Sequence, residues 1–123
     1  MRRAVAATIL CVLAAVPAKA QAPVQIVFFP DWSGAMDDAA KAVIEHAADA
    51  AKQAPKATIT VTGYADAKGS AKANQFLAKL RAQRVIDALV DDGVPAAHLK
   101  MVAAGKQPET GVVGRRVEIA IGK

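Results

Sequence analysis

Two spacings of apolar residues divide this chain into strand-like and helix-like segments. Four short segments are apolar runs or alternate between apolar and polar positions, which predicts strands: residues 24–29, 57–64, 99–105 and 115–121. In the last of them the alternation turns Val117, Ile119 and Ile121 inward. Two longer segments repeat apolar residues every three or four positions, which predicts amphipathic helices with one buried side.

Capping and breaking residues delimit these helices. Asp31 or Ser33 is expected to cap the first helix, and Pro55 ends it. Ser70 opens the second helix, which runs to about Asp91, with Gly93 as its C-terminal cap. The order β-α-β-α-β-β predicts an α+β fold of two layers, a mixed sheet with two helices packed on one face.

The first twenty residues differ in composition from the rest. A basic start is followed by an apolar run and by Ala18-Lys19-Ala20, a typical cleavage pattern, and the run is too short to cross a bilayer. Residues 1–20 are therefore predicted to be a secretory signal peptide, and residues 21–123 a single exported domain.

Removal of this signal peptide changes what the composition implies. It leaves 13 of the 16 basic residues against 11 acidic ones, and this weak positive charge does not favour nucleic-acid binding. Cys11, the one cysteine, leaves with the signal peptide. His46 and His98 have no metal-ligand spacing, and neither an acid pair nor a nucleophile motif is present. We expect no metal, no cofactor and no enzymatic activity.

One charged residue of the second helix lies where an apolar one is expected. Arg81 shares its side of the helix with Leu77 and Val85, and a buried guanidinium needs hydrogen-bond acceptors. Asp66 follows the second strand and is the nearest acid. Asp66 and Arg81 either pair with each other and brace this corner, or flank a pocket and bind the two charges of a zwitterion. The residues alone leave these readings equal.

Three motifs together carry a family resemblance. "GYADAKGS", "ANQFLAKLRAQRVIDALVDDGVP" and "GRRVEIAI" resemble the OmpA-like carboxy-terminal domain of outer-membrane barrel anchors, peptidoglycan-associated lipoproteins and flagellar stator proteins. The resemblance covers nearly all of residues 21–123. It implies non-covalent binding of peptidoglycan through the diaminopimelate of the stem peptide.

Position by position, the resemblance assigns four binding residues. The loop aspartate is Asp66, the helix arginine Arg81 and the helix asparagine Asn74. An arginine of the last strand is Arg115 or Arg116, and alternation favours Arg115. Asp66 is expected to accept the diaminopimelate ammonium, and Arg81 to bind its carboxylate.

The chain also departs from the family pattern. Trp32 stands where asparagine is frequent, Ala65 where threonine is usual, and Ala78 where serine is usual. An alternative is therefore a periplasmic protein-interaction or assembly domain that keeps the fold without binding the wall. We expect a periplasmic protein, associated with the outer membrane or the cell wall, with an envelope protein as a further partner.

Overall fold

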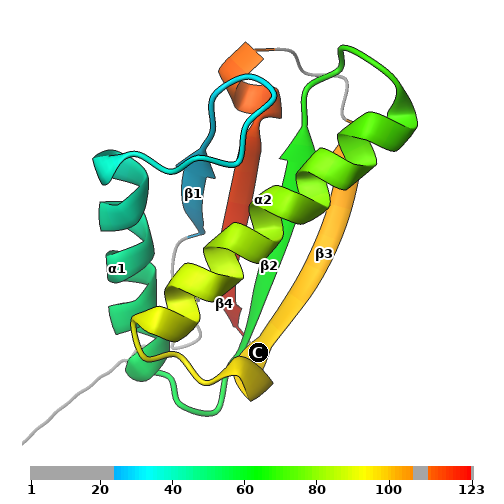
Figure 1. The fold of residues 1–123 in the computed structure, drawn as a ribbon. Coiled ribbons are helices and arrows are strands. Elements are labelled where there is room, and N and C mark those ends of the chain that lie inside the picture. The colour runs from blue at the N-terminus through cyan, green and yellow to red at the C-terminus, as the bar shows by residue number, and fades with distance from the viewer. Residues whose placement is uncertain (1–23, 107–110, 123) are drawn as a thin grey trace, which may run out of the picture.

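The computed structural model describes residues 24–106 and 111–122, and the side chains of all but Gly105 and Lys106 among them. It contains four strands, two helices and two short 3-10 turns (Figure 1). They are β1 Gln25–Phe28, α1 Asp38–Lys52, β2 Thr58–Ala65, α2 Ala71–Asp91, η1 Ala96–His98, β3 Leu99–Lys106, η2 Gly111–Gly114 and β4 Arg116–Gly122. The predicted order of elements is confirmed. The predicted signal peptide lies outside the described residues.

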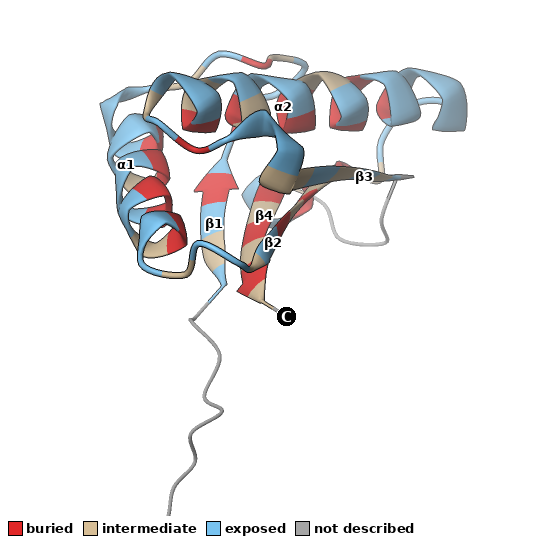
Figure 2. Cartoon of the chain, turned by 90° about the horizontal axis from the view of Figure 1, so that it is seen from below, coloured by how far each residue is buried: buried red, intermediate tan, exposed pale blue. Residues whose placement is uncertain are grey.

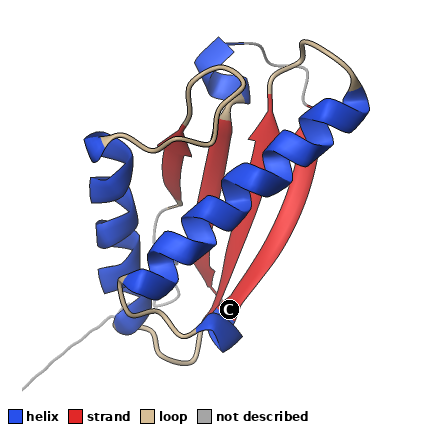
Figure 3. Ribbon diagram, viewed as in Figure 1, coloured by secondary structure: helices blue, strands red, loops and turns tan. Residues whose placement is uncertain are grey.

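The strands form one mixed sheet in the order β1-β4-β2-β3. Strand β4 runs antiparallel to both neighbours, and β2 and β3 are parallel (Figure 3). The parallel pair needs a crossover, which α2 provides. This connection brings the end of β2, the start of α2 and the start of β4 to the same edge of the sheet (Figure 1).

Helix α2 lies across one face of the sheet, and α1 lies beside it on the β1 side (Figure 2). The predicted inward positions of β4 are buried, as is most of the apolar stripe of α1 (Figure 2). The core is formed by Val27, Phe29, Ile44, Ile59, Val61, Val85, Leu89, Val94, Val117, Ile119 and Ile121, among others. The predicted two-layer α+β class is confirmed.

The helix ends follow local rules, with one correction. The carboxylate of Asp37, rather than Asp31 or Ser33, caps α1 by accepting a hydrogen bond from the N–H of Ala40 at 2.8 Å. The chain after β1 is thus in a loop for longer than predicted. Ser70 caps α2 as expected, and Gly93 ends it in the left-handed region at φ 103°.

The closest approach of α2 to the sheet occurs over a glycine. A Cβ at Gly63 of β2 would lie 2.1 Å from the carbonyl oxygen of Ala78. No side chain fits there, so the small residues Gly63, Ala78 and Ala82 let helix and strand backbones come together. This contact sets the position of the first half of α2, which carries the candidate site. No described helix is long and apolar enough to cross a membrane.

Candidate binding site

Three loops meet at the edge of the sheet where β1 and β2 end and β4 begins (Figure 1). They are residues 29–37, which we call the β1 loop, residues 66–70, which we call the β2 loop, and η2 with Arg115. All four predicted site residues contact this cluster. Two of them belong to the loops, and two reach it from α2.

Asp66 is the first residue after β2 and is almost fully buried. Its Oδ1 accepts a hydrogen bond from the N–H of Lys68 at 3.2 Å. Its Oδ2 accepts one from the N–H of Gly111 at 3.1 Å and lies 3.5 Å from Nη1 of Arg115. The carboxylate therefore joins the β2 loop to η2 and to the start of β4.

The electrostatic environment of Asp66 favours its charged form. Burial raises the pKa of the carboxyl, but hydrogen bonds from the backbone N–H groups of Lys68 and Gly111 outweigh burial. The net pKa of Asp66 lies below its ordinary value. Asp66 is therefore a fixed negative charge at neutral pH, which is what binding an ammonium group requires.

Arg81 is completely buried and donates hydrogen bonds to the β1 loop. Its Nε donates to the carbonyl of Ser33 at 2.8 Å, and its Nη2 donates to the carbonyl of Pro30 at 2.9 Å. The third nitrogen, Nη1, makes a longer contact of 3.5 Å with the carbonyl of Tyr64. The guanidinium also lies 5.6 Å from the centre of the Phe29 ring. Arg81 thus satisfies its donors with backbone carbonyls.

Of the two readings left open for Asp66 and Arg81, the one in which they pair directly with each other is wrong. The ion-pair partner of Asp66 is Arg115. Arg81 instead donates hydrogen bonds to the backbone carbonyls of Ser33 and Pro30. The two arginines are still close enough to interact electrostatically. Burial lowers the pKa of Arg81 to about 10, and the positive charge of Arg115 acts in the same direction. Arg81 remains charged at neutral pH, but no part of it is exposed to solvent.

Two adjacent arginines at the start of β4 point in different directions. Arg115 donates from Nε to the carbonyl of Phe29 at 2.9 Å and reaches Asp66 with Nη1. Arg116 lies on the open face of the sheet, 3.9 Å from the centre of the Tyr64 ring and paired with Glu118 at 2.9 Å. Arg115, and not Arg116, therefore lies beside Asp66. Arg115 keeps 18% of its side chain exposed, whereas Arg81, the other guanidinium group near Asp66, is fully buried.

Asn74 of α2 holds the β2 loop by hydrogen bonds. Its side-chain N–H₂ group donates to the carbonyls of Lys68 and Ser70, on either side of Gly69. The side chain is 1% exposed, so in this conformation it fixes the loop that follows Asp66. The predicted role of Asn74 as a ligand contact stays a prediction.

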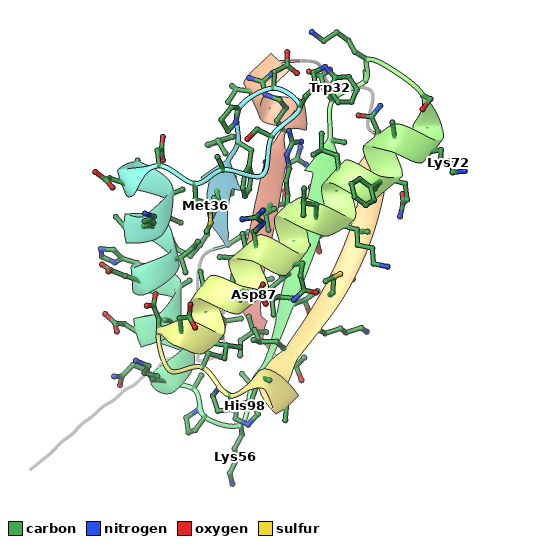
Figure 4. All side chains as sticks on the ribbon, viewed as in Figure 1. Trp32, Met36, Lys56, Lys72, Asp87 and His98 are labelled. Atoms are coloured by element: carbon green, nitrogen blue, oxygen red, sulfur yellow. The ribbon has the colours of Figure 1, made fainter. Side chains whose placement is uncertain are left out.

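Two further residues, Gly111 and Trp32, belong to the site without having been assigned to it from the motifs. The N–H of Gly111, 45 residues from Asp66, carries no side-chain signal. Trp32 lies at the tip of the β1 loop, 54% exposed and outside the core (Figure 4). Trp32 is exposed because the β1 loop is longer than the periodicity of the sequence predicted.

Chemically, the cluster offers one buried carboxylate beside two guanidinium groups, which suits a ligand that carries an ammonium and a carboxylate. Within residues 24–106 and 111–122, no group of histidine, cysteine, aspartate and glutamate side chains has an arrangement that could hold a metal ion.

Comparison with known proteins identifies the family. A model of the OmpA family matches residues 28–113, which is most of the chain, so the chain belongs to the OmpA family. The resemblance read from the three motifs is confirmed.

Two curated relatives resemble part of this chain in sequence. The peptidoglycan-binding protein ArfA of Mycobacterium tuberculosis is 36% identical over 87 residues, covering 64% of this chain and 27% of the relative. The peptidoglycan-associated lipoprotein of Agrobacterium fabrum is 31% identical over 86 residues, covering 70% and 49%. The chain thus spans half or less of the length of these relatives. One of them is named as a binding protein and the other as a lipoprotein.

Solved structures have the same fold. The peptidoglycan-associated lipoprotein of Burkholderia pseudomallei aligns with a TM-score of 0.73 at 26% identity, over 79% of this chain and 89% of that one. The periplasmic domain of MotB from Helicobacter pylori aligns with a TM-score of 0.70 at 25% identity, over 84% and 77%.

Proposed function

We propose that this protein binds peptidoglycan non-covalently, through the diaminopimelate of the stem peptide, at the edge of the sheet where Asp66 lies. The observation that carries the proposal is the buried carboxylate of Asp66 beside the guanidinium groups of Arg115 and Arg81. Family membership supports it, as do relatives named for peptidoglycan. On this basis we place the protein in the cell envelope, at the wall.

Each site residue has a distinct role in the proposal. Asp66 accepts the ammonium of diaminopimelate, since its charge is fixed by backbone N–H groups. Arg115, which has exposed surface, binds the adjacent carboxylate. Arg81 adds a second positive charge from beneath while its donors stay bonded to the carbonyls of Ser33 and Pro30. Asn74 keeps the β2 loop in place.

The test is co-sedimentation of the purified protein with isolated cell-wall sacculi. We expect wild type to sediment with sacculi that contain diaminopimelate, and Asp66→Ala to bind them roughly 30-fold more weakly, because a charge-paired ligand group loses its partner. Asp49→Asn is the matched control, since it also removes one carboxylate but from the exposed side of α1. It should bind like wild type.

A second wall chemistry separates the general proposal from the specific one. Sacculi with lysine in place of diaminopimelate lack the carboxylate beside the ammonium. Equal binding to both kinds of sacculi would remove the diaminopimelate specificity and keep peptidoglycan binding. Wild-type protein that stays in the supernatant with both would exclude wall binding.

One observation favours the alternative, a protein-interaction domain. The face of the sheet opposite the helices exposes Ile26 and Phe28 of β1 at one edge and Val102 of β3 at the other, and η2 exposes Val112 and Val113. Exposed apolar surface of this kind marks protein contacts in many soluble domains. This face and the Asp66 cluster use different residues, so the two functions are compatible.

A further inference from the structure

Trp32 occupies an unusual backbone conformation at the tip of the β1 loop. Its φ is 50°, which makes it the one residue other than glycine with a positive φ in the described part of the chain. A bulky side chain in this left-handed region is strained, and such strain persists only where surrounding contacts impose it. Contacts around Trp32 therefore hold it in this conformation.

Two buried side chains of α2 supply these contacts from below. Arg81 bonds the carbonyls of Pro30 and Ser33, on either side of the tip of the β1 loop. Asn74 bonds the carbonyls of Lys68 and Ser70, on either side of Gly69 in the β2 loop. Each loop is thus held at two points that flank its tip.

The two loop tips also contact each other. The indole lies against Gly69, where a Cβ would be 2.7 Å from Cη2 of Trp32, and Gly69 itself has a φ of 87°. The ammonium of Lys68 lies 3.6 Å from the carboxylate of Asp31. Figure 4 places Trp32 between the β1 loop and the segment leading into α2. The indole therefore lies between two anchored loops with about half of its surface in solvent.

A rigid, exposed tryptophan beside a charged cluster is suited to binding. Large aromatic side chains with little conformational freedom contribute strongly to affinity because little entropy is lost on contact. The face of the indole is electron-rich and attracts C–H groups of partial positive charge, such as those on the apolar face of a sugar ring. An indole in this setting favours a pyranose as its partner.

The distance along the ligand agrees with this assignment. Gly69 is three residues from Asp66, a span of at most about 11 Å for an extended chain. The few stem-peptide residues between diaminopimelate and the amino sugar extend over roughly 10 Å. A ligand anchored at Asp66 can therefore bring its sugar to Trp32.

We propose that Trp32 is an aromatic platform for the amino sugar of the glycan strand, so that the site binds sugar and stem peptide together. The proposal rests on the function proposed above.

The test compares two soluble probes, a tripeptide ending in diaminopimelate and the same tripeptide attached to its disaccharide. Calorimetric titration of wild type should give about ten-fold tighter binding for the disaccharide probe. Trp32→Asn should abolish this difference and leave tripeptide affinity unchanged, because asparagine tolerates a positive φ but has no ring. Phe76→Ala, which removes an exposed aromatic from α2, is the control and should change neither affinity.

Trp32 is the one tryptophan in the chain, so its fluorescence reports directly on this position. We expect the emission to shift with the disaccharide probe and to stay constant with the tripeptide. Equal affinity of wild type for both probes, or equal weakening of both by Trp32→Asn, would overturn the platform while keeping the diaminopimelate site. Binding of neither probe to wild type would overturn the proposed function and this inference with it.

Discussion

The two halves of α2 belong to the same helix and bury different kinds of side chain. The second half, residues 82–91, buries Ala82, Val85 and Leu89 against the apolar core. The first half, residues 71–81, buries Asn74 and Arg81 alongside Leu77 and Ala78. The second half stabilises the fold by apolar burial. The first half uses the polar groups of Asn74 and Arg81 to hold the tips of two loops.

This difference separates stability from site geometry along one helix. Apolar packing has no preferred direction and tolerates small shifts. Hydrogen bonds from Arg81 and Asn74 fix particular carbonyls at particular distances. The comparison therefore predicts that damage to the two halves has different consequences for binding.

The largest effect on stability is expected from Leu89→Ala in the second half. Leu89 is fully buried, and truncation of such a residue costs about 3 kcal/mol in the free energy of unfolding. Because the loops do not depend on Leu89, the folded fraction should bind sacculi with wild-type affinity. Denaturant unfolding and co-sedimentation at low temperature measure the two properties. A loss of affinity in fully folded Leu89→Ala would contradict the separation.

A smaller cost in stability with a clear effect on the site is expected from Arg81→Met. Methionine keeps most of the apolar volume but loses the donors to Ser33 and Pro30, which costs about 2 kcal/mol. Release of the β1 loop should shift the emission of Trp32 in the folded protein and weaken sugar-dependent binding. Lys79→Met, on the exposed side of the same helix, should leave both unchanged. Unaltered emission in Arg81→Met would show that Arg81 does not hold the loop.

The smallest effect depends on pH and is confined to the site. The pKa of Asp66 is lowered in the folded state, so its contribution to stability is complete above the ordinary carboxyl pKa of about 4. That contribution is lost as the pH falls through the lower, folded pKa. The difference in unfolding free energy between wild type and Asp66→Asn should therefore be constant from pH 7 to about pH 5 and shrink in more acidic solution. A difference that grows on acidification would reverse the assigned sign.

Much of the fold was predictable from local patterns. The alternation in β4 indicated its buried residues, and the caps Ser70 and Gly93 indicated the ends of α2 to within a residue. The start of α1 was misplaced because Asp31, Ser33 and Asp37 all satisfy the same capping rule. Only the path of the β1 loop, set by Arg81, selects among them.

The candidate site was predictable in its members and not in its contacts. The apolar side of α2 showed that Arg81 would be buried, and the motif pointed to Asp66, Asn74 and Arg115. The sequence suggested Asp66 as the partner of Arg81, since acids are the visible acceptors in a sequence. A sequence shows which residues carry opposite charges but not which of them meet. In the folded protein Asp66 pairs with Arg115, which is 49 positions away.

The amino-acid sequence by itself determined the strands, the helices, the buried stripe and the presence of a buried cation, because periodicity and residue type record these directly. The tertiary structure alone decided what that cation holds. Its partners are the carbonyls of Pro30 and Ser33, 51 and 48 residues away. Every residue carries a carbonyl, so no residue type marks the ones that an arginine will bind. Only the packing of α2 over Gly63 brings those carbonyls within reach of Arg81, and with them the exposed ring of Trp32.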